Sequence, residues 1–147
     1  MQIRQATAAD LDRLVPLFDA YRVFYGQPSD PELARSFLRD RFEHLQSIVF
    51  LALARDRPLG FTQLYPSFSS ARARRIFILN DLFVVAEARG RGVGRALLAA
   101  AAEHGKAVGA ARLTLSTGVD NRTAQALYEA AGLTRDTAFV SYNLPLD

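Results

Sequence analysis

The chain has 147 residues, half of them hydrophobic, with 18 basic and 15 acidic residues and a formal net charge of +3. We expect a single domain spanning residues 1–147, because this length supports one sizeable core and leaves no room for a second. The absence of cysteine excludes disulfides and zinc–thiolate sites, and with only two histidines we expect no metal.

The charge pattern does not indicate nucleic-acid binding, because acidic residues nearly balance the basic ones. The densest basic cluster, Arg72, Arg74 and Arg75, follows the serine-rich segment 67–70 and is typical of a solvated surface turn. The start of the chain lacks the charged and apolar regions of a signal peptide, and no run of 18 apolar residues occurs. We therefore expect a cytoplasmic protein with neither nucleic acid nor membrane as a partner.

Alternating helical and strand periodicities favour an α/β domain. Residues 2–6 predict a strand, and Thr7 with Asp10 predicts a capping box at the start of a helix that ends between residues 21 and 25. The residues of this helix expected to face the core are Leu11, Leu14, Val15 and Phe18. After a break at 26–31, Pro31 begins a second helix that runs to about His44.

The next elements are mostly strands. We predict an antiparallel meander of three strands, at 47–54, 59–65 and 76–85. The later elements expected are a helix at 92–104, a strand at 112–116, a helix at 123–131 and a closing strand at 139–144.

The strongest motif is a basic glycine turn between the third meander strand and the next helix. Alternate glycines let a backbone approach a ligand closely, and the first turn of a helix offers unpaired N–H groups to an anion. The residues that we expect to hold a phosphorylated ligand are Arg89, Gly90, Arg91, Gly92, Val93, Gly94 and Arg95. The spacing matches neither the dinucleotide fingerprint nor the nucleoside-triphosphate loop, whose Gly-Lys pair occurs only at Gly105-Lys106. The plain alternative is a tight strand-to-helix connection.

Two motifs together resemble the GNAT family of N-acetyltransferases. One is Arg-x-x-Gly-x-Gly, formed by Arg89, Gly92 and Gly94, and the other is the segment 121–133, which resembles the family's asparagine-to-tyrosine helix. The resemblance implies an α/β (α+β) domain with a mixed, mostly antiparallel sheet of six or seven strands and about four helices. It also implies a splayed strand pair that admits acetyl-CoA, with the glycine turn around the pyrophosphate.

The resemblance further implies roles for individual residues. Backbone groups of Phe83, Val84 and Val85 would bind the pantetheine arm, and Asn121 would lie near it. Tyr128 would lie beside the sulfur and protonate the leaving thiolate. The alternatives are that Asn121 caps a helix and that Tyr128 is a buried amphipathic side chain.

The acceptor site has weaker signals in the sequence. Residues 79–84 are similar to the Leu-Glu-Asp-Phe-Phe-Val stretch of diamine and polyamine acetyltransferases, but Asn80 replaces the glutamate that helps deprotonate the amine. Asp81 is the candidate base, although strand alternation sends its side chain to the face opposite Asn80, and it is equally a structural carboxylate. Further acceptor candidates, aromatic or acidic and also compatible with a core role, are Tyr21, Tyr25, Asp30 and Tyr65.

The sequence thus favours an acetyl-CoA-dependent N-acetyltransferase that moves an acetyl group to a primary amine by direct attack. The acceptor stays open between a polyamine, an amino acid, an antibiotic and a protein lysine, and related enzymes are often homodimers. Two other classes remain: a non-catalytic acyl-CoA sensor of the same fold, and a basic interaction module.

Overall fold

The structure is a computed structural model and describes residues 1–147. Its elements in chain order are β1 (Gln2–Gln5), a 3-10 turn (Ala8–Asp10), α1 (Leu11–Phe24), α2 (Pro31–Glu43), β2 (Ile48–Ala54), β3 (Arg57–Ser69), β4 (Arg74–Val84), a second 3-10 turn (Ala86–Ala88), α3 (Val93–Ala107), β5 (Leu113–Thr114) and α4 (Arg122–Ala130). The chain divides into two compact units, residues 1–116 and 117–147, which we describe separately.

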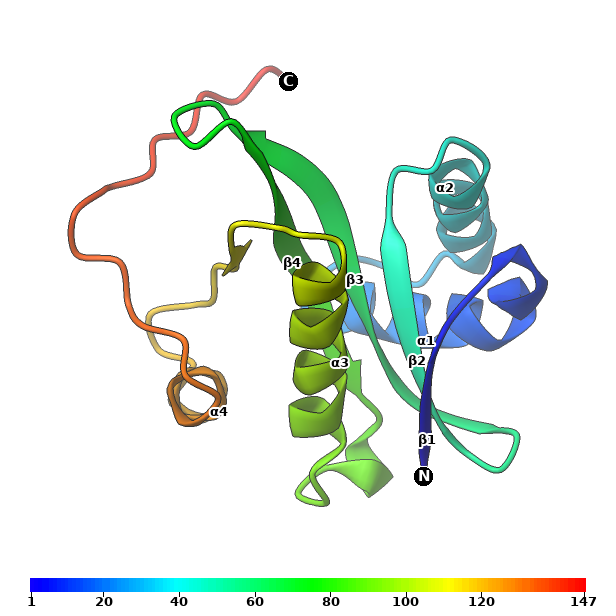
Figure 1. The fold of residues 1–147 in the computed structure, drawn as a ribbon. Coiled ribbons are helices and arrows are strands. Elements are labelled where there is room, and N and C mark those ends of the chain that lie inside the picture. Colours follow the sequence, from blue (N-terminus) through cyan, green and yellow to red (C-terminus); the bar gives the residue numbers. More distant parts are fainter. The chain divides into compact units, whose positions relative to one another are not determined.

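The first unit contains a five-stranded sheet in the order β1-β2-β3-β4-β5 (Figure 1). Strands β1 to β4 form an antiparallel meander, whereas β5 runs parallel to β4 after the α3 crossover. The predicted α/β class and meander are therefore confirmed, and β3 and β4 form a longer hairpin than the sequence predicts.

Local sequence signals explain where the first two helices begin. Thr7 and Asp10 form the predicted capping box, which starts the 3-10 turn that continues into α1. Asp30 caps α2 through a hydrogen bond from the Leu33 amide to its carboxylate (3.1 Å), and Pro31 occupies the first turn, where no amide partner is needed.

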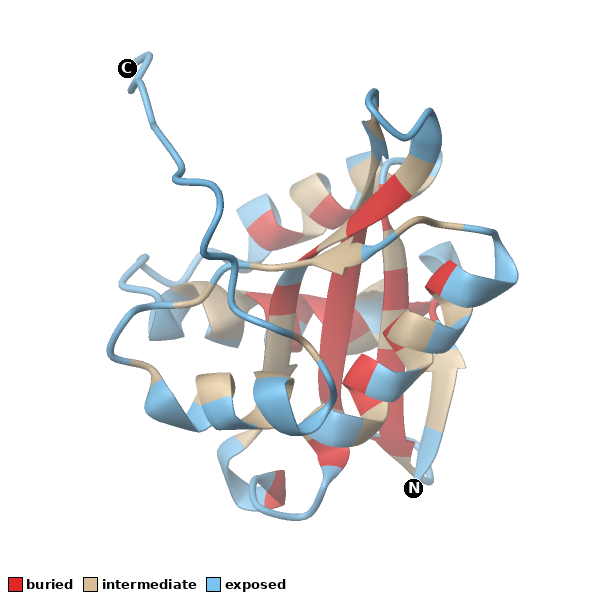
Figure 2. Ribbon diagram, turned by 60° about the vertical axis from the view of Figure 1, so that its left-hand side comes forward, coloured by how far each residue is buried: buried red, intermediate tan, exposed pale blue.

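Two apolar layers cover the sheet of the first unit. On one face α1 and α2 pack on β2 and β3, with Leu14, Phe18 and Leu38 among the buried residues. On the other face α3 packs through Val93 and Leu97. Figure 2 shows the buried residues concentrated along the strands and on the helix sides that face them. This layering leaves the ends of the strands and the β4 edge to carry polar chemistry.

Two expectations about strands are wrong in detail. The sheet has five strands instead of six or seven, because β5 covers only Leu113–Thr114 and residues 139–144 form no strand. The apolar alternation in 139–144 has no partner strand, and strand propensity without a partner does not build a ladder. The segment instead follows a turn in which the Ala138 and Phe139 amides donate to the Asp136 carboxylate (2.9 and 3.2 Å). None of the helices has the length and apolar character needed to cross a membrane.

A partly buried ion pair joins the start of the chain to the beginning of α1. The Asp10 carboxylate accepts two hydrogen bonds from Arg4 (2.7 and 2.9 Å) and one from the Thr7 amide (2.9 Å). The hydrogen bonds from Arg4 are the main reason that the pKa of Asp10 falls to about 2. Because the folded pKa lies below the unfolded one, this stabilisation is complete above about pH 5 and is lost as the pH falls toward 2.

We predict that Asp10→Asn lowers the free energy of unfolding by about 2 kcal/mol at pH 7 and flattens its dependence on pH between 5 and 2. Urea unfolding at several pH values measures both effects. Asp56→Asn is the matched control, because Asp56 is 98% exposed and lies 3.9 Å from Arg13. A wild-type acid limb in the Asp10→Asn variant would contradict the assignment.

Candidate functional site

Strand β4 contains a β-bulge between Leu79 and Asp81. In the β3–β4 register Gln63 pairs with Asp81 and Leu64 pairs with Leu79, which leaves Asn80 as an extra residue. A bulge breaks strict side-chain alternation. The amide of Asn80 accordingly donates to the Asp81 carboxylate (2.8 Å), so the expectation that these two side chains lie on opposite faces is wrong.

Beyond the bulge, one edge of β4 has no partner strand. Strand β5 pairs only with Phe77 and Ile78, so the two strands part before the bulge. The Val85 amide donates to the Leu59 carbonyl (2.9 Å) on the β3 side. Since backbone groups of successive strand residues point to opposite edges, Leu82 and Val84 direct theirs to the open edge. The free backbone groups there are those of Leu82 and the amide of Val84, because the Val84 carbonyl accepts a hydrogen bond from Arg89 and the Val85 amide is already used.

The glycine turn follows this open edge directly and lies at the lower end of α3 in Figure 1. Gly90 and Gly92 have φ values of +78° and +81°, a conformation that side chains rarely adopt, and Gly92 has open space around it. No hydrogen bond within the protein uses the N–H groups of residues 90–95. The first turn of α3 has neither a capping side chain nor an acidic residue, so this row of amides is available to an anion.

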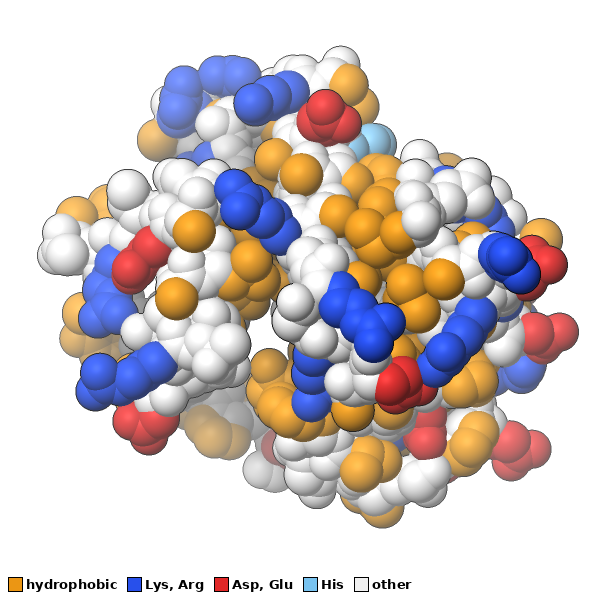
Figure 3. Space-filling view, turned by 90° about the horizontal axis from the view of Figure 1, so that it is seen from below, with side chains coloured by type: hydrophobic (Ala, Val, Ile, Leu, Met, Phe, Trp, Pro, Cys, Tyr) orange, Lys and Arg blue, Asp and Glu red, His pale blue; other side chains and the backbone are white.

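The basic side chains of the turn differ in their roles. Arg91 and Arg95 are exposed and form no ion pair. The Arg89 guanidinium instead donates from Nε to the Val84 carbonyl (2.9 Å) and lies over the rings of Phe24 and Phe83. Arg89 therefore fastens the turn to β4. Figure 3 views the first unit from the end at which α3 begins and shows Lys and Arg side chains interspersed with apolar ones.

Asp81 is a buried carboxylate on the sheet face that α1 and α2 cover. Its side chain accepts hydrogen bonds from the amides of Gln63 (2.5 Å) and Asn80 (2.8 Å). Burial is the largest influence and raises the pKa of Asp81 above the usual aspartate range, while these donors and Tyr21 oppose the rise. A carboxyl whose pKa is raised in this way is a stronger base than an ordinary aspartate.

Besides Asn80 and Asp81, the sequence predicts four acceptor residues, of which three are tyrosines. Two of these, Tyr21 and Tyr65, lie close to Asp81. Burial, and next the negative charge of Asp81, raise the pKa values of Tyr21 and Tyr65 above the usual range. The Tyr21 hydroxyl donates to the Asn80 carbonyl (3.2 Å), and its ring lies 4.9 Å from the ring of the exposed Tyr25. Asp30 is engaged as the cap of α2.

The second unit carries the asparagine-to-tyrosine helix, α4. The side-chain oxygen Oδ1 of Asn121 accepts a hydrogen bond from the Ala124 amide (3.1 Å), so Asn121 is the N-cap of α4 as the helix-cap alternative expects. Tyr128 follows seven residues later on the same side of the helix and is partly buried. Their roles toward a ligand remain predictions.

The structure reveals polar residues that the sequence did not single out. Gln63, Arg41 and Ser47 each have a buried side-chain atom without a hydrogen-bond partner. Gln63 had a visible signal, since it and Thr62 are the polar residues in a mostly apolar stretch of strand. Arg41 and Ser47 had none, because an arginine near a helix end and a serine before a strand are common on surfaces.

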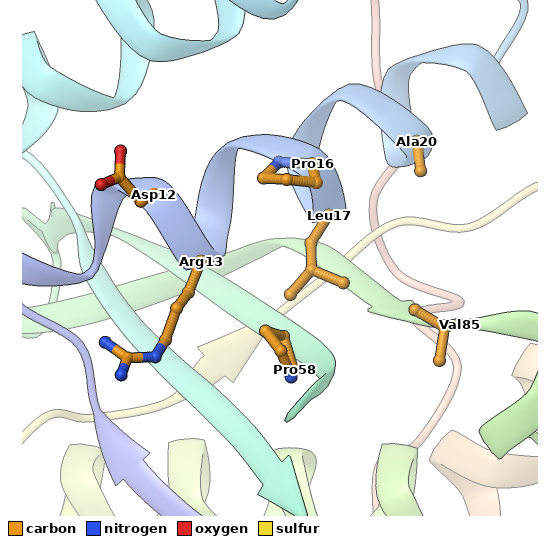
Figure 4. A pocket seen from close by; sticks show the side chains of 7 residues that line it. All are labelled: Asp12, Arg13, Pro16, Leu17, Ala20, Pro58 and Val85. Atoms are coloured by element: carbon orange, nitrogen blue, oxygen red, sulfur yellow. The ribbon is translucent and has the colours of Figure 1, made fainter. Parts of the chain in front are cut away.

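A separate apolar hollow of about 440 Å³ lies along α1 (Figure 4). It is lined by Asp12, Arg13, Pro16, Leu17, Ala20, Pro58 and Val85. Its charged residues are already paired, Asp12 with Arg35 (2.8 Å) and Arg13 with Asp10 (3.4 Å). Only Val85 among the predicted site residues lines it, and no free polar group converges on it. No three His, Cys, Asp or Glu side chains are grouped so that they could hold a metal ion.

An open strand edge that runs into a row of free amides, inside a mixed sheet, can hold an extended anionic ligand. The acetyltransferase (GNAT) family model matches residues 13–133. The chain belongs to this family.

Individual relatives agree with this assignment. The chain is 49% identical over 144 residues to the uncharacterized N-acetyltransferase YhfO of Bacillus subtilis, covering 98% of this chain and 97% of that one. A crystal structure of a probable acetyltransferase matches with a TM-score of 0.96 and 48% identity, covering 100% and 99%. The aminoglycoside N-acetyltransferase AAC(6')-Iy in complex with CoA shares the fold, with a TM-score of 0.79 and 21% identity over 97% and 93%.

We predict that Gln63→Leu raises the pKa of Asp81 further, because it removes an amide that stabilises the ionised carboxylate. Carbon NMR titration of aspartate-labelled protein measures the change. Gln27→Leu is the control, since Gln27 is exposed in the loop before α2. An unchanged or lowered Asp81 pKa in Gln63→Leu would remove the inferred role of this hydrogen bond.

Proposed function

We propose that this chain is an acetyl-CoA-dependent N-acetyltransferase that moves an acetyl group to a primary amine by direct attack in a ternary complex. The observation that carries the proposal is the continuity between the open edge of β4 and the unpaired amides of residues 90–95. A long ligand with an amide-bearing arm and a pyrophosphate matches both features in that order. The CoA complex of the similarly folded AAC(6')-Iy supports the same ligand class.

The residues present fit the donor. Leu82 offers its backbone groups and Val84 its amide along the open edge, where strand-like pairing suits the amides of a pantetheine arm. The amides of residues 90–95, with Arg91 and Arg95 nearby in sequence, suit the negative charge of a pyrophosphate. When bound, acetyl-CoA supplies the activated acetyl thioester.

The proposed reaction needs two proton transfers, one from the amine and one to the leaving thiolate. The amine must lose a proton as its new C–N bond forms, and Asp81 is the proposed acceptor because burial raises its pKa. As the C–S bond breaks, the thiolate gains a proton, and Tyr128 is the proposed donor on the basis of the family resemblance. Asn80 cannot act as the base, but its amide orients the Asp81 carboxylate.

We predict that Gly92→Asp weakens acetyl-CoA binding by ~10²-fold or more, because it adds a side chain and a negative charge beside the free amides. Calorimetric titration measures the affinity. Gly109→Asp is the matched control, because Gly109 has a similar φ of +75° and equally open surroundings after the end of α3. Equal affinities for the two variants would remove the glycine turn from the donor site.

We predict that Tyr128→Phe lowers kcat by ~10²-fold while acetyl-CoA affinity stays within about twofold, on the usual scale for a general acid. Free-thiol detection with a panel of primary amines measures the rate. Tyr142→Phe is the control, since Tyr142 is 91% exposed. Full activity of the Tyr128→Phe variant means that water protonates the sulfur, whereas acetyl-CoA binding without thiol release from any amine favours an acyl-CoA sensor.

A further inference from the structure

A band of buried polar groups extends beyond Asp81 on the face that α1 and α2 cover. Gln63 Oε1, Arg41 Nε and Ser47 Oγ lie buried without a hydrogen-bond partner, and they are three of the four such atoms in the protein. Gln63 is fully buried and Ser47 is only 7% exposed. Since buried polar atoms are nearly always paired, three unpaired ones in one region offer hydrogen-bond partners to a polar ligand.

The sheet register brings two of these groups to a common region. Gln63 stands opposite Asp81, and Tyr65 follows two residues later on the same face of β3. In the β2–β3 register Ile48 pairs with Leu64, which brings Ser47, one residue earlier, to the level of Tyr65. The polar groups thus follow β3 from the Asp81 level to the Tyr65 level.

Arg41 supplies an uncompensated positive charge to this band from α2. Its guanidinium lies 4.5 Å from the centre of the Phe37 ring and forms no ion pair. The Phe37 ring stacks on the Phe18 ring with 5.4 Å between centroids, and the Phe18 ring stacks on the Tyr21 ring with 6.1 Å between centroids. A row of aromatic rings therefore runs from Arg41 to Tyr21, which lies beside Asp81.

Tyr65 is within electrostatic reach of both ends of this row. Burial raises the pKa of the Tyr65 phenol most, the charge of Asp81 raises it further, and Arg41 opposes the rise. A partly buried arginine without an anion retains a desolvation cost that a bound carboxylate would offset. The region therefore has a negative end at Asp81 and a positive end at Arg41.

We propose that the acyl acceptor carries a carboxylate as well as its primary amine, and is therefore an amino acid. Arg41 holds the carboxylate, while Asp81 and the free oxygen of Gln63 receive the ammonium group. This inference rests on the proposed function and names its substrate class. A polyamine, which has cationic groups alone, would leave Arg41 unpaired.

The test compares amines that differ only by a carboxylate. L-lysine is paired with cadaverine, and L-leucine with 3-methylbutylamine, in the thiol-release assay. The wild-type protein should show kcat/KM at least ~10-fold higher for one amino acid than for its decarboxylated partner, chiefly through a lower KM. Equal or higher values for both decarboxylated amines would overturn the inference.

Variants on α2 locate the carboxylate site. Arg41→Gln should bring the ratio close to one by raising KM for the amino acid, and Arg41→Lys should retain part of the preference. Arg39→Gln is the matched control, because Arg39 is exposed two residues earlier on the same helix. A preference that persists in Arg41→Gln, with the same unfolding midpoint as the wild type, would overturn the role of Arg41.

A binding measurement separates this inference from the proposed function. Calorimetric titration of the protein with each amine, without acetyl-CoA, should show tighter binding of the amino acid and loss of that difference in Arg41→Gln. If acetyl-CoA binds but the amino acid has no advantage, the inference fails and the transferase proposal stands. If acetyl-CoA does not bind, the proposed function fails, while a carboxylate preference that depends on Arg41 would still support the amino-acid site.

Discussion

The site depends on the unequal pairing of β4. This strand pairs with β3 along its length but with β5 at only two residues, and the extra residue Asn80 shifts its register where the pairing with β5 has ended. The unpaired edge and the position of the Asp81 carboxylate both follow from this arrangement. A regular ladder on both sides would have consumed the free backbone groups and sent Asp81 and Asn80 to opposite faces.

The two faces of β4 have different chemistry. On the α3 face Leu82 and Val84 pack against an apolar cluster that includes Ala88, just before the glycine turn, and Val93 within it. On the other face Asp81 lies among tyrosines and amides, where burial raises its pKa. In the proposed function, one strand therefore offers its edge to the acyl donor and one face to the amine.

The sequence predicted the elements up to the end of α3 well, because caps, periodicity and glycines are local signals. Asp30 with Pro31, and Thr7 with Asp10, mark helix starts without knowledge of the rest of the chain. The Asn80 bulge was not predictable, since it depends on how β4 aligns with β3. The strand expected at 139–144 failed for the same reason, because alternation shows a preference for a strand and does not supply a partner.

The sequence suggested Asp81 and the tyrosines as site residues, but it could not reveal the environment of Arg41. An arginine four residues after Phe37 is an ordinary pattern on a helix surface, and only the packing of α2 on the sheet buries its Nε atom.

The short ladder between β4 and β5 also has a dynamic consequence. Only a few backbone hydrogen bonds hold β5, among them Phe77 N–H to the Arg112 carbonyl (3.1 Å) and Ala111 N–H to the Arg75 carbonyl (2.7 Å). Regions with few bonds and little buried surface open at the lowest free-energy cost. The amides of residues 111–114 should thus exchange with solvent through local fraying, while those of the β2–β3 pairing exchange only when the whole first unit unfolds.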